Sequence, residues 1–422
     1  MAVVTVAINS IEQVEVILKK YVENARQYIH DGLTLERMWP MLESVGNPHK
    51  KLKVIHVAGT SGKTSTAFYI AGLLHASGKK VGLTVSPHVD SITERVQING
   101  RPITDIEFCS EISEFLTIIE ETGSVQSPSY FELMIVFALW EFSRQGVDYA
   151  VIETGLGGLL DSTNVVTRKD KVCVITDIGL DHQAILGSTI AEIAGQKAGI
   201  IHGGNHVFMN TQSEEVMAVF KKKTEVMNAI ISINDPRSHV LIEDTVQLAL
   251  FQRRNYSLAR TVAKFVAERD GFVTVSNFNP LDVVIKGRME EMIVQDGSML
   301  IMDGAHNAQK MSAFVASFQA KYPEQKATIL LALKQGKEYT EVVDALKPIT
   351  QLLIVTTFSV SQDVPISCLD PEAVAAYANS VEVETVIFKD NKEAYQALHD
   401  TQAEIKIITG SFYLLGQMRA LL

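Results

Sequence analysis

Cysteine is scarce in this sequence, and its three copies, Cys109, Cys173 and Cys368, lie far apart. Neither a disulfide framework nor the paired spacing of a metal site follows from them, so a reducing compartment is expected. Long apolar runs are also missing, since none approaches the roughly 20 residues that a membrane span requires. Residues 1–10 contain no basic region followed by an apolar stretch, which argues against a secretory leader. We therefore expect a cytoplasmic protein that does not enter a membrane.

Positively charged residues are fewer than negatively charged ones. The sequence has 38 Lys and Arg and 49 Asp and Glu, which give a net charge of -11. That balance argues against non-specific binding to nucleic acid or to a membrane surface, although a local basic pocket can still hold an anionic ligand. The chain has 422 residues, 46% of them hydrophobic and 21% charged. Such a length and composition indicate a globular protein of two or three domains with ample core.

What is present is a candidate phosphate-binding loop. The apolar stretch Val54–Ala58 predicts a buried strand, residues 59–65 read Gly-Thr-Ser-Gly-Lys-Thr-Ser, and residues 66–76 predict a helix. Glycines let backbone N–H groups approach phosphate oxygens, and a helix N-terminus favours negative charge. Lys63 can then reach a phosphate, while a following hydroxyl can hold Mg²⁺. The alternative is a glycine-rich turn that merely caps a helix, and the flanking strand and helix favour the phosphate loop.

Strands and helices alternate through both halves of the chain, which predicts parallel sheets covered on both faces. Turn-forming residues Asn277, Asn279 and Pro280 separate the two halves. The fold class is therefore α/β, with a mostly parallel phosphate-loop ATPase domain at 1–284 and a smaller Rossmann-like domain at 287–422. The expected strands are 54–58, 81–86, 148–153, 171–176, 206–209, 299–302, 328–333, 352–356, 386–388 and 405–409. The expected helices include 107–120, 131–145, 189–198, 308–320, 339–346, 371–380, 392–401 and 412–421.

Polar side chains stand at the expected carboxyl ends of strands in the first domain, where open parallel sheets bind ligands. Glu153 ends one strand and is a candidate Mg²⁺ ligand, although a solvated turn charge is the plain alternative. His182, beside Asp181, could complete such a site, although oxygen ligands are usual for magnesium and a structural pair is commoner. Lys197, near the end of an expected helix, reads from its surroundings alone as a partner for helix carbonyls.

The second domain repeats this arrangement of polar residues after a strand. Asp303 and His306 follow the strand 299–302, so they too are expected to face a crevice. Arg288 is a candidate clamp for a phosphate or a carboxylate. The alternative for Arg288 is a surface ion pair with Glu290, which contributes little.

Taken in order, these segments resemble the folylpolyglutamate synthase/dihydrofolate synthase family, within the Mur-ligase-like ATP-dependent amide ligases. The resemblance runs through nearly the whole chain, and the order of its segments makes it specific. The segments that carry it are 35–38, 46–49, 59–65, 86–88, 94–100, 130–132, 153–158, 161–164, 181–187, 197–201, 251–255, 288–290, 303–307 and 409–414.

The resemblance implies that ATP phosphorylates a folate carboxylate and that the amine of L-glutamate then attacks the acyl phosphate. The partners are then ATP, L-glutamate and a folate or pteroate, and a monomer is expected. The implied ATP-binding residues are Gly59, Thr60, Ser61, Gly62, Lys63, Thr64, Ser65, Asn255, Arg288 and Asp303. The implied Mg²⁺ ligands are Ser86, Glu153 and His182, with room for a monovalent cation such as K⁺. The implied catalytic residues are Lys63, Lys197, His182 and His306, and Lys197 is expected to be carbamylated.

The sequence also departs from the family pattern, so other functions stay open. The departures are Ser61, Thr64, Leu159, Gln196, Ala308 and the segment 334–337. A Mur-ligase-like enzyme that acts on another carboxylate, such as a cell-wall precursor, is one alternative. Only about fifty residues precede the loop, whereas most cell-wall ligases of this kind carry an additional N-terminal domain there. A non-catalytic ATP-binding module is the other alternative, and the joint presence of the candidate residues argues against it. The sequence leaves open whether dihydrofolate synthesis, polyglutamate extension or both occur.

Overall fold

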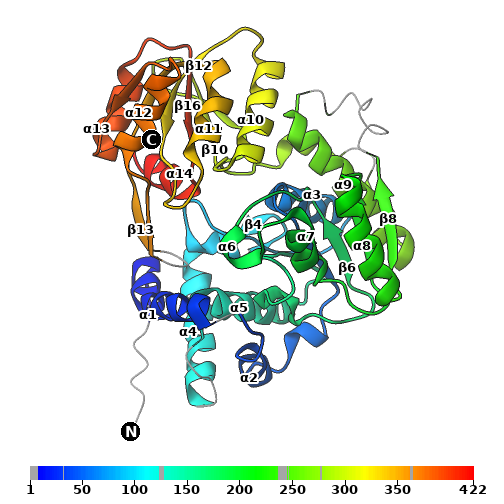
Figure 1. Ribbon diagram of the computed structural model, residues 1–422. Helices are drawn as coiled ribbons and strands as arrows, with labels where there is room; N and C mark the ends of the chain where they lie inside the picture. Colours follow the sequence, from blue (N-terminus) through cyan, green and yellow to red (C-terminus); the bar gives the residue numbers. More distant parts are fainter. Residues whose placement is uncertain are drawn as a thin grey trace. The chain divides into compact units, whose positions relative to one another are not determined.

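The structure, a computed structural model, describes residues 8–31, 33–122, 128–235, 245, 247–275, 278–361 and 365–422 (Figure 1). It divides into two compact units. Unit 1 comprises Met1–Ile242, Arg254–Val283 and Gln362–Val364, and unit 2 comprises Glu243–Arg253, Val284–Ser361 and Pro365–Leu422. Asn277, which helped to mark the expected boundary, lies outside the described residues.

Unit 1 is built on an eight-stranded sheet in the order β4-β3-β2-β5-β1-β6-β7-β8. Neighbours from β2 to β8 pair in parallel, whereas β3 and β4 form an antiparallel edge. The strands are β1 Val54–Ala58, β2 Val81–Thr84, β3 Gln97–Ile98, β4 Arg101–Pro102, β5 Tyr149–Glu153, β6 Val172–Ile175, β7 His206–Asn210 and β8 Ile230–Asn234.

The central strands are buried along their whole length, which explains their continuous apolar sequences. Every residue of β1, β5 and β6 is buried. One buried cluster joins residues of β1 and β5 to α1, α4 and α5, and another joins β6 and β7 to α7 and α8. The sheet is therefore a rigid base for the loops at its carboxyl edge.

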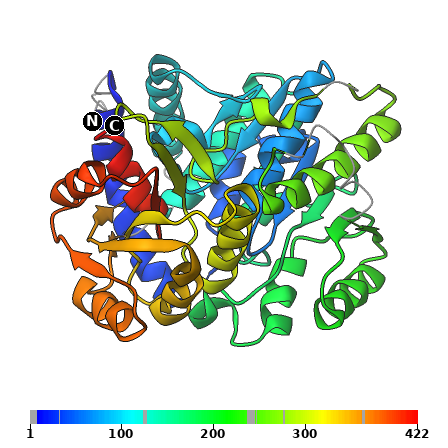
Figure 2. The same cartoon turned by 90° about the horizontal axis from the view of Figure 1, so that it is seen from above.

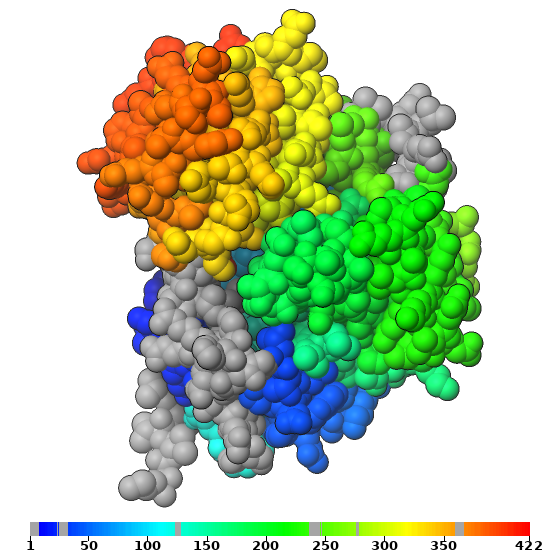
Figure 3. Space-filling model, in the orientation of Figure 1, coloured from blue at the N-terminus to red at the C-terminus, as the bar shows by residue number. Residues whose placement is uncertain are grey.

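The helices of unit 1 agree with the expected pattern, with additions. They are α1 Ile11–Asp31, α2 Met38–Ser44, α3 Lys63–Ala76, α4 Asp105–Glu121, α5 Tyr130–Arg144, α6 Gln183–Leu186, α7 Ile190–Ala198, α8 Glu214–Val226 and α9 Leu250–Asp270, the last continuing from unit 2. Helix α3 begins at Lys63 rather than at residue 66, because the left-handed Gly62 (φ 88°) turns the chain directly into it. Helices α2, α6, α8 and α9 were not among those expected. Figure 2 shows α9 as one continuous helix, and part of α8 lies at the surface of unit 1 in Figure 3.

Unit 2 contains a six-stranded sheet in the order β15-β12-β11-β16-β10-β9, parallel except for β9. Its strands are β9 Glu290–Ile293, β10 Met299–Asp303, β11 Ala327–Leu331, β12 Thr350–Val355, β15 Thr385–Ile387 and β16 Ile405–Thr409, with the separate hairpin β13 Ser359–Ser361 and β14 Pro365–Ser367. Its helices are α10 Ala308–Lys321, α11 Tyr339–Leu346, α12 Pro371–Ser380, α13 Asn391–Asp400 and α14 Phe412–Arg419. The expected fold class, two α/β domains with mostly parallel sheets, is confirmed.

Within the described ranges, no helix combines the length and the apolar character needed to cross a bilayer.

Candidate functional site

Four neighbouring parallel strands of unit 1 end beside one another, and three of them lead directly to a candidate residue. The pairing of β2 with β5, of β5 with β1 and of β1 with β6 places these ends in one row. Ser86 follows β2, Glu153 ends β5, Gly59 follows β1 and Asp177 follows β6. The carboxyl edge of a parallel sheet is where such folds bind ligands.

The phosphate loop needs its glycines because its neighbours leave no space for side chains. A Cβ on Gly59 would lie 1.8 Å from Oγ1 of Thr176, and one on Gly62 would lie 2.4 Å from Oδ1 of Asn255. Asn255 thus lies beside the loop. The loop differs from expectation in one respect: the N–H groups of Thr60 and Ser61 donate to the carbonyl of Asp177, at 2.8 and 3.1 Å. The first turn of α3 therefore provides the N–H groups best placed for phosphate.

Two lysines meet at the carbonyl oxygen of Gly59. Nζ of Lys63 lies 3.2 Å from this oxygen, and Nζ of Lys197 lies 2.7 Å from it. Lys197 is buried, with only 5% of its surface exposed, and it lies near the end of α7. A Cβ on Gly158 would lie 3.0 Å from Cα of Lys197, so this glycine lets the turn after β5 approach α7 closely.

Glu153 is a buried carboxylate that joins two other candidates. Its Oε1 accepts the hydroxyl of Thr64 at 2.9 Å, and its Oε2 accepts the N–H of Ser86 at 3.3 Å. Hydroxyl and carboxylate oxygens are the donors that magnesium prefers. The structure therefore brings together two of the three expected metal ligands, Glu153 and Ser86.

The third expected ligand, His182, starts α6 with a left-handed backbone (φ 52°), and 43% of its side chain is exposed. Its Nε2 lies 3.9 Å from Oδ1 of Asp181. In the part of the chain that the structure describes, no three His, Cys, Asp or Glu side chains cluster as a metal centre would require. Magnesium bound here would therefore take hydroxyl oxygens and phosphate oxygens as well.

A buried network behind the loop was missed in the sequence analysis. His56, in the middle of β1, contacts the hydroxyls of Thr163 and Thr154 through Nε2, at 2.8 and 3.0 Å. Thr163 in turn donates to Asp161. Burial holds the pKa of His56 well below its ordinary value and raises the pKa of Asp161. The signal was a histidine inside an apolar strand, which needs a polar partner when buried.

The second group of candidates lies in unit 2, at the end of β10. Both oxygens of Asp303 accept backbone N–H groups, from Met289 and Ala305, each at 2.8 Å. Burial raises the pKa of Asp303 to about 6, against the opposing effects of Arg288 and these hydrogen bonds. The Arg288 guanidinium lies 4.0 Å from the centre of the Phe412 ring, a cation–π contact.

His306 is held at both ring nitrogens. Its Nδ1 lies 2.8 Å from the carbonyl of Gly304, and the Nζ of Lys310 lies 2.9 Å from its Nε2. A carbonyl only accepts and an ammonium only donates, so the contacts assign a neutral ring protonated on Nδ1. The ring also meets Phe412 edge to face, with centroids 6.1 Å apart. Lys310 was another residue that the sequence analysis missed, although its spacing of four from His306 on a helix was visible.

The family model for the Mur ligase middle domain matches residues 57–259, the part of the chain that contains the glycine loop, the row of strand ends and Lys197. The class that this match gives is an ATP-dependent ligase of the Mur type. The model for the dihydrofolate synthetase C-terminal domain matches residues 288–421. The chain belongs to the folylpolyglutamate synthase/dihydrofolate synthase family of ATP-dependent ligases, which add glutamate to folates.

Two curated relatives and one solved structure support this membership over nearly full length. Dihydrofolate synthase/folylpolyglutamate synthase of Bacillus subtilis is 29% identical, over 94% of this chain and 98% of its own. Dihydrofolate synthetase of Saccharomyces cerevisiae is 30% identical, and the match covers 92% of this chain and 97% of the yeast protein. The structure of Mycobacterium tuberculosis folylpolyglutamate synthase complexed with ADP aligns with a TM-score of 0.81 and 26% identity. The alignment covers 97% of this chain and 98% of the mycobacterial chain. Of the readings that the sequence left open, the folate ligase is confirmed.

Proposed function

We propose that this chain uses ATP to attach L-glutamate to the carboxylate of a folate or pteroate, through an acyl phosphate. The observation that carries the proposal is the meeting of Lys63 and Lys197 at the Gly59 carbonyl, beside the hydrogen-bonded pair of Thr64 and Glu153. Cations, hydroxyls and a carboxylate at the N-terminus of a helix suit a bound nucleotide with its metal.

In the proposed reaction, a substrate carboxylate oxygen attacks the γ-phosphorus of ATP, the bond to the β,γ-bridging oxygen breaks, and ADP leaves. The glutamate nitrogen then attacks the acyl carbon, inorganic phosphate leaves, and the nitrogen loses a proton. Negative charge increases on the transferring phosphoryl group in the first step. Lys63 and the N-terminus of α3 would stabilise that charge.

The oxygens near Glu153 fit magnesium. Thr64 offers a hydroxyl oxygen that is hydrogen-bonded to the Glu153 carboxylate, and the backbone N–H of Ser86 donates to the other oxygen of that carboxylate. The Ser86 side chain would add a second hydroxyl. Magnesium, when bound, would neutralise phosphate charge and hold the phosphate oxygens in place. His182 stays a candidate ligand, and a monovalent cation such as K⁺ stays a prediction.

The surroundings of Lys197 support its carbamylation. Two ammonium groups at one carbonyl oxygen repel each other, most strongly where one is buried. Attack of the neutral amine on carbon dioxide would form an N–C bond and release a proton. Lys197 would then carry a negative charge, which can pair with Lys63 or with a metal ion.

A further set of proposed nucleotide-binding groups lies in unit 2. We propose that Arg288 binds an oxyanion of the nucleotide, because its planar guanidinium is already oriented on the Phe412 ring. Asp303 would hold the backbone on both sides of that arginine through Met289 and Ala305. His306 would lie beside them as a neutral side chain.

The decisive experiment measures ADP release with a panel of acceptors, each supplied with glutamate and with other amino acids. Dihydropteroate and tetrahydrofolate test the two folate activities separately, and a UDP-muramoyl substrate tests the cell-wall alternative. We expect glutamate-dependent release with at least one folate acceptor. Release with the UDP-muramoyl substrate alone, or with none of the acceptors, would contradict the proposal.

A further inference from the structure

The segment after β6 holds the phosphate loop at two residues, Asp177 and Gly179. The Thr60 hydroxyl donates to the carbonyl of Gly179 at 3.0 Å and accepts its N–H at 3.1 Å. The oxygen of Asp177 accepts N–H groups from two successive loop residues, Thr60 at 2.8 Å and Ser61 at 3.1 Å. Two hydrogen bonds to one oxygen fix the direction of both peptide planes. The backbone directions at Thr60 and Ser61 therefore depend on where Asp177 lies.

The position of Asp177 is set in turn by Arg254, on α9. Nε of Arg254 lies 2.9 Å from both carboxylate oxygens of Asp177, and Nη2 lies 2.7 Å from Oδ1. The same Nη2 donates to the carbonyl of Thr211, after β7, at 3.0 Å. The pair is only partly solvated, with 30% of the arginine side chain and 28% of the aspartate side chain exposed. Such two-point contacts are directional as well as attractive.

The next residue of α9 touches the same loop at a second point. Oδ1 of Asn255 occupies the space that a Cβ on Gly62 would need, at 2.4 Å. Consecutive residues of α9 thus contact the loop on both sides of the Ser61–Gly62 peptide, one through Asp177 and one directly. A displacement of this end of α9 would change both contacts.

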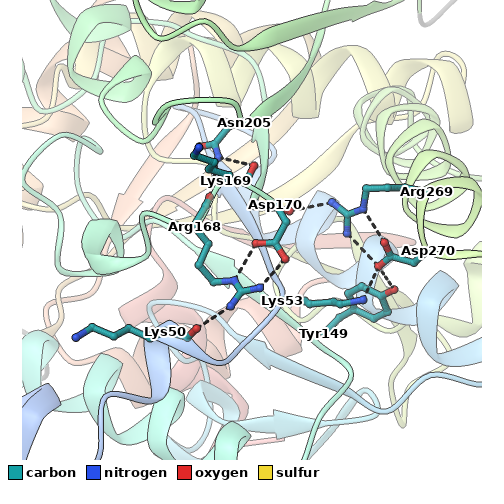
Figure 4. Close-up of polar contacts among 9 residues, drawn as sticks. All are labelled: Lys50, Lys53, Tyr149, Arg168, Lys169, Asp170, Asn205, Arg269 and Asp270. Carbon is teal, nitrogen blue, oxygen red and sulfur yellow. Dashed lines mark hydrogen bonds and ion pairs between the residues drawn. The ribbon is translucent and has the colours of Figure 1, made fainter.

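The other end of α9 is fixed independently, by residues at the amino ends of β1, β5 and β6 (Figure 4). Asp270 binds Lys53 at 3.0 Å and the Tyr149 hydroxyl at 2.5 Å, and Arg269 donates to the carbonyl of Asp170 at 2.8 Å. Residues 254 and 270 are about 24 Å apart along a helix axis. Loss of the Arg254 contact would therefore leave α9 anchored and free only the loop.

We propose that Arg254 and Asp177 are positioning residues that fix the phosphate loop in its ATP-binding conformation. The proposal rests on the proposed role of the loop, and it adds a pair outside the Gly-Lys-Thr segment that sets the loop's geometry. Neither side chain needs to touch the nucleotide. Their effect would reach the reaction through the N–H groups of Thr60 and Ser61, which the Asp177 carbonyl holds.

The test compares Arg254→Met, Asp177→Asn and the double variant in steady-state kinetics. Each single change should raise the KM for ATP about five- to thirtyfold, the range that one or two kcal/mol produces. The KM for glutamate and the melting temperature should stay close to native values. The double variant should be no worse than the worse single variant, because both changes break one interaction. Arg254→Lys should recover part of the loss by keeping one charged contact.

The matched control is Lys264→Met, which removes a positive charge from the same helix. Its side chain is 74% exposed and pairs only loosely with Glu268, at 3.8 Å. An unchanged KM for ATP in Arg254→Met, or additive losses in the double variant, would overturn the proposal. Lys63→Ala distinguishes failure of this proposal from failure of the phosphate-loop assignment. If Lys63→Ala abolishes turnover while Arg254→Met has no effect, the phosphate-loop assignment stands and only the positioning role of Arg254 and Asp177 is wrong.

Discussion

The two units hold their cationic candidates by different means. In unit 1, Lys63 and Lys197 both reach a backbone carbonyl, that of Gly59. In unit 2, Arg288 lies on the ring of Phe412 and also donates from Nη1 to the carbonyl of Gly287 at 3.1 Å, and Lys310 binds the ring of His306. A carbonyl oxygen is present whatever the side chain, so the arrangement in unit 1 depends on backbone geometry. The arrangement in unit 2 depends in addition on two particular ring side chains, so substitution of either ring should disturb it.

The largest effect should come from Lys63→Ala. Lys63 is the mobile cation at the N-terminus of α3, and its loss should lower kcat about 10²- to 10³-fold while the protein stays folded. The measurement is ADP release at saturating substrates, with circular dichroism as a check on folding. Lys51→Ala, an exposed lysine before β1, is the control and should behave as native. Near-native ADP release by Lys63→Ala would refute the phosphate-loop assignment.

Arg288 tests whether the ring-based arrangement in unit 2 matters for the reaction. Arg288→Ala should reduce kcat/KM for ATP about tenfold to a hundredfold, since hydrogen bonds to charged groups contribute about 1.5–3 kcal/mol. Arg288→Lys should restore little, because an ammonium lacks the planar face that rests on Phe412. Full recovery with lysine would show that only the charge matters, and the contrast between the units would fail.

Lys197 tests whether both lysines of unit 1 remain cations. If Lys197 carries a carbamate, Lys197→Ala should lose about tenfold to a hundredfold in turnover, as for residues that support a metal. A short carboxylic acid added to the assay should restore part of this loss. Native mass spectrometry in bicarbonate should show the added carbon dioxide on the unsubstituted protein. An unmodified mass with no rescue would mean that Lys197 acts as an ammonium.

Much of unit 1 could be predicted because its signals are local. Continuous apolar strands followed by turns predicted β1, β5 and β6, and the expected Val54–Ala58 strand has the same bounds in the structure. Glycine placement predicted the loop, and the clashes at Gly59 and Gly62 give the physical reason. Candidate residues at strand ends met because parallel strands end at a common edge.

What could not be predicted depends on contacts between distant segments. Arg254 and Asp177 are 77 residues apart, and only the order of strands in the sheet brings β6 beside the loop. The same holds for His56 and Thr163, which are 107 residues apart. Such pairs leave no periodic pattern in the sequence, so tertiary structure is needed to find them.

Asp303 should give unit 2 a pH-dependent stability. Burial raises its pKa from 3.8 to about 6, so the folded state holds this proton more tightly than the unfolded state. The contribution of the protonated Asp303 to the free energy of unfolding is fully present below pH 3.8 and is lost as the pH rises through about 6. A shift of this size corresponds to roughly 3 kcal/mol.

The measurement is the melting temperature of the native protein and of Asp303→Asn between pH 4 and 7. The asparagine does not ionise. The melting temperature of the native protein should therefore fall relative to that of Asp303→Asn as the pH rises across this range. Other carboxylates titrate equally in both proteins and cancel in the difference. A difference that stays constant with pH would show that Asp303 is already ionised in the folded state.

The smallest effect on turnover should come from Lys310→Met. This change removes the ammonium that lies 2.9 Å from Nε2 of His306, while Nδ1 keeps its bond to Gly304 and the ring keeps its contact with Phe412. We expect a loss of about threefold to tenfold, since one hydrogen bond contributes about 1 kcal/mol. Because Nε2 loses this donor, His306 should also react faster with diethyl pyrocarbonate, measured by peptide mass. Lys321→Met, on the same helix α10 and paired with Glu291 at 2.6 Å, should change neither quantity. If His306 reacts at the native rate in Lys310→Met, the lysine does not hold the ring, and the two units differ only in how Arg288 is supported.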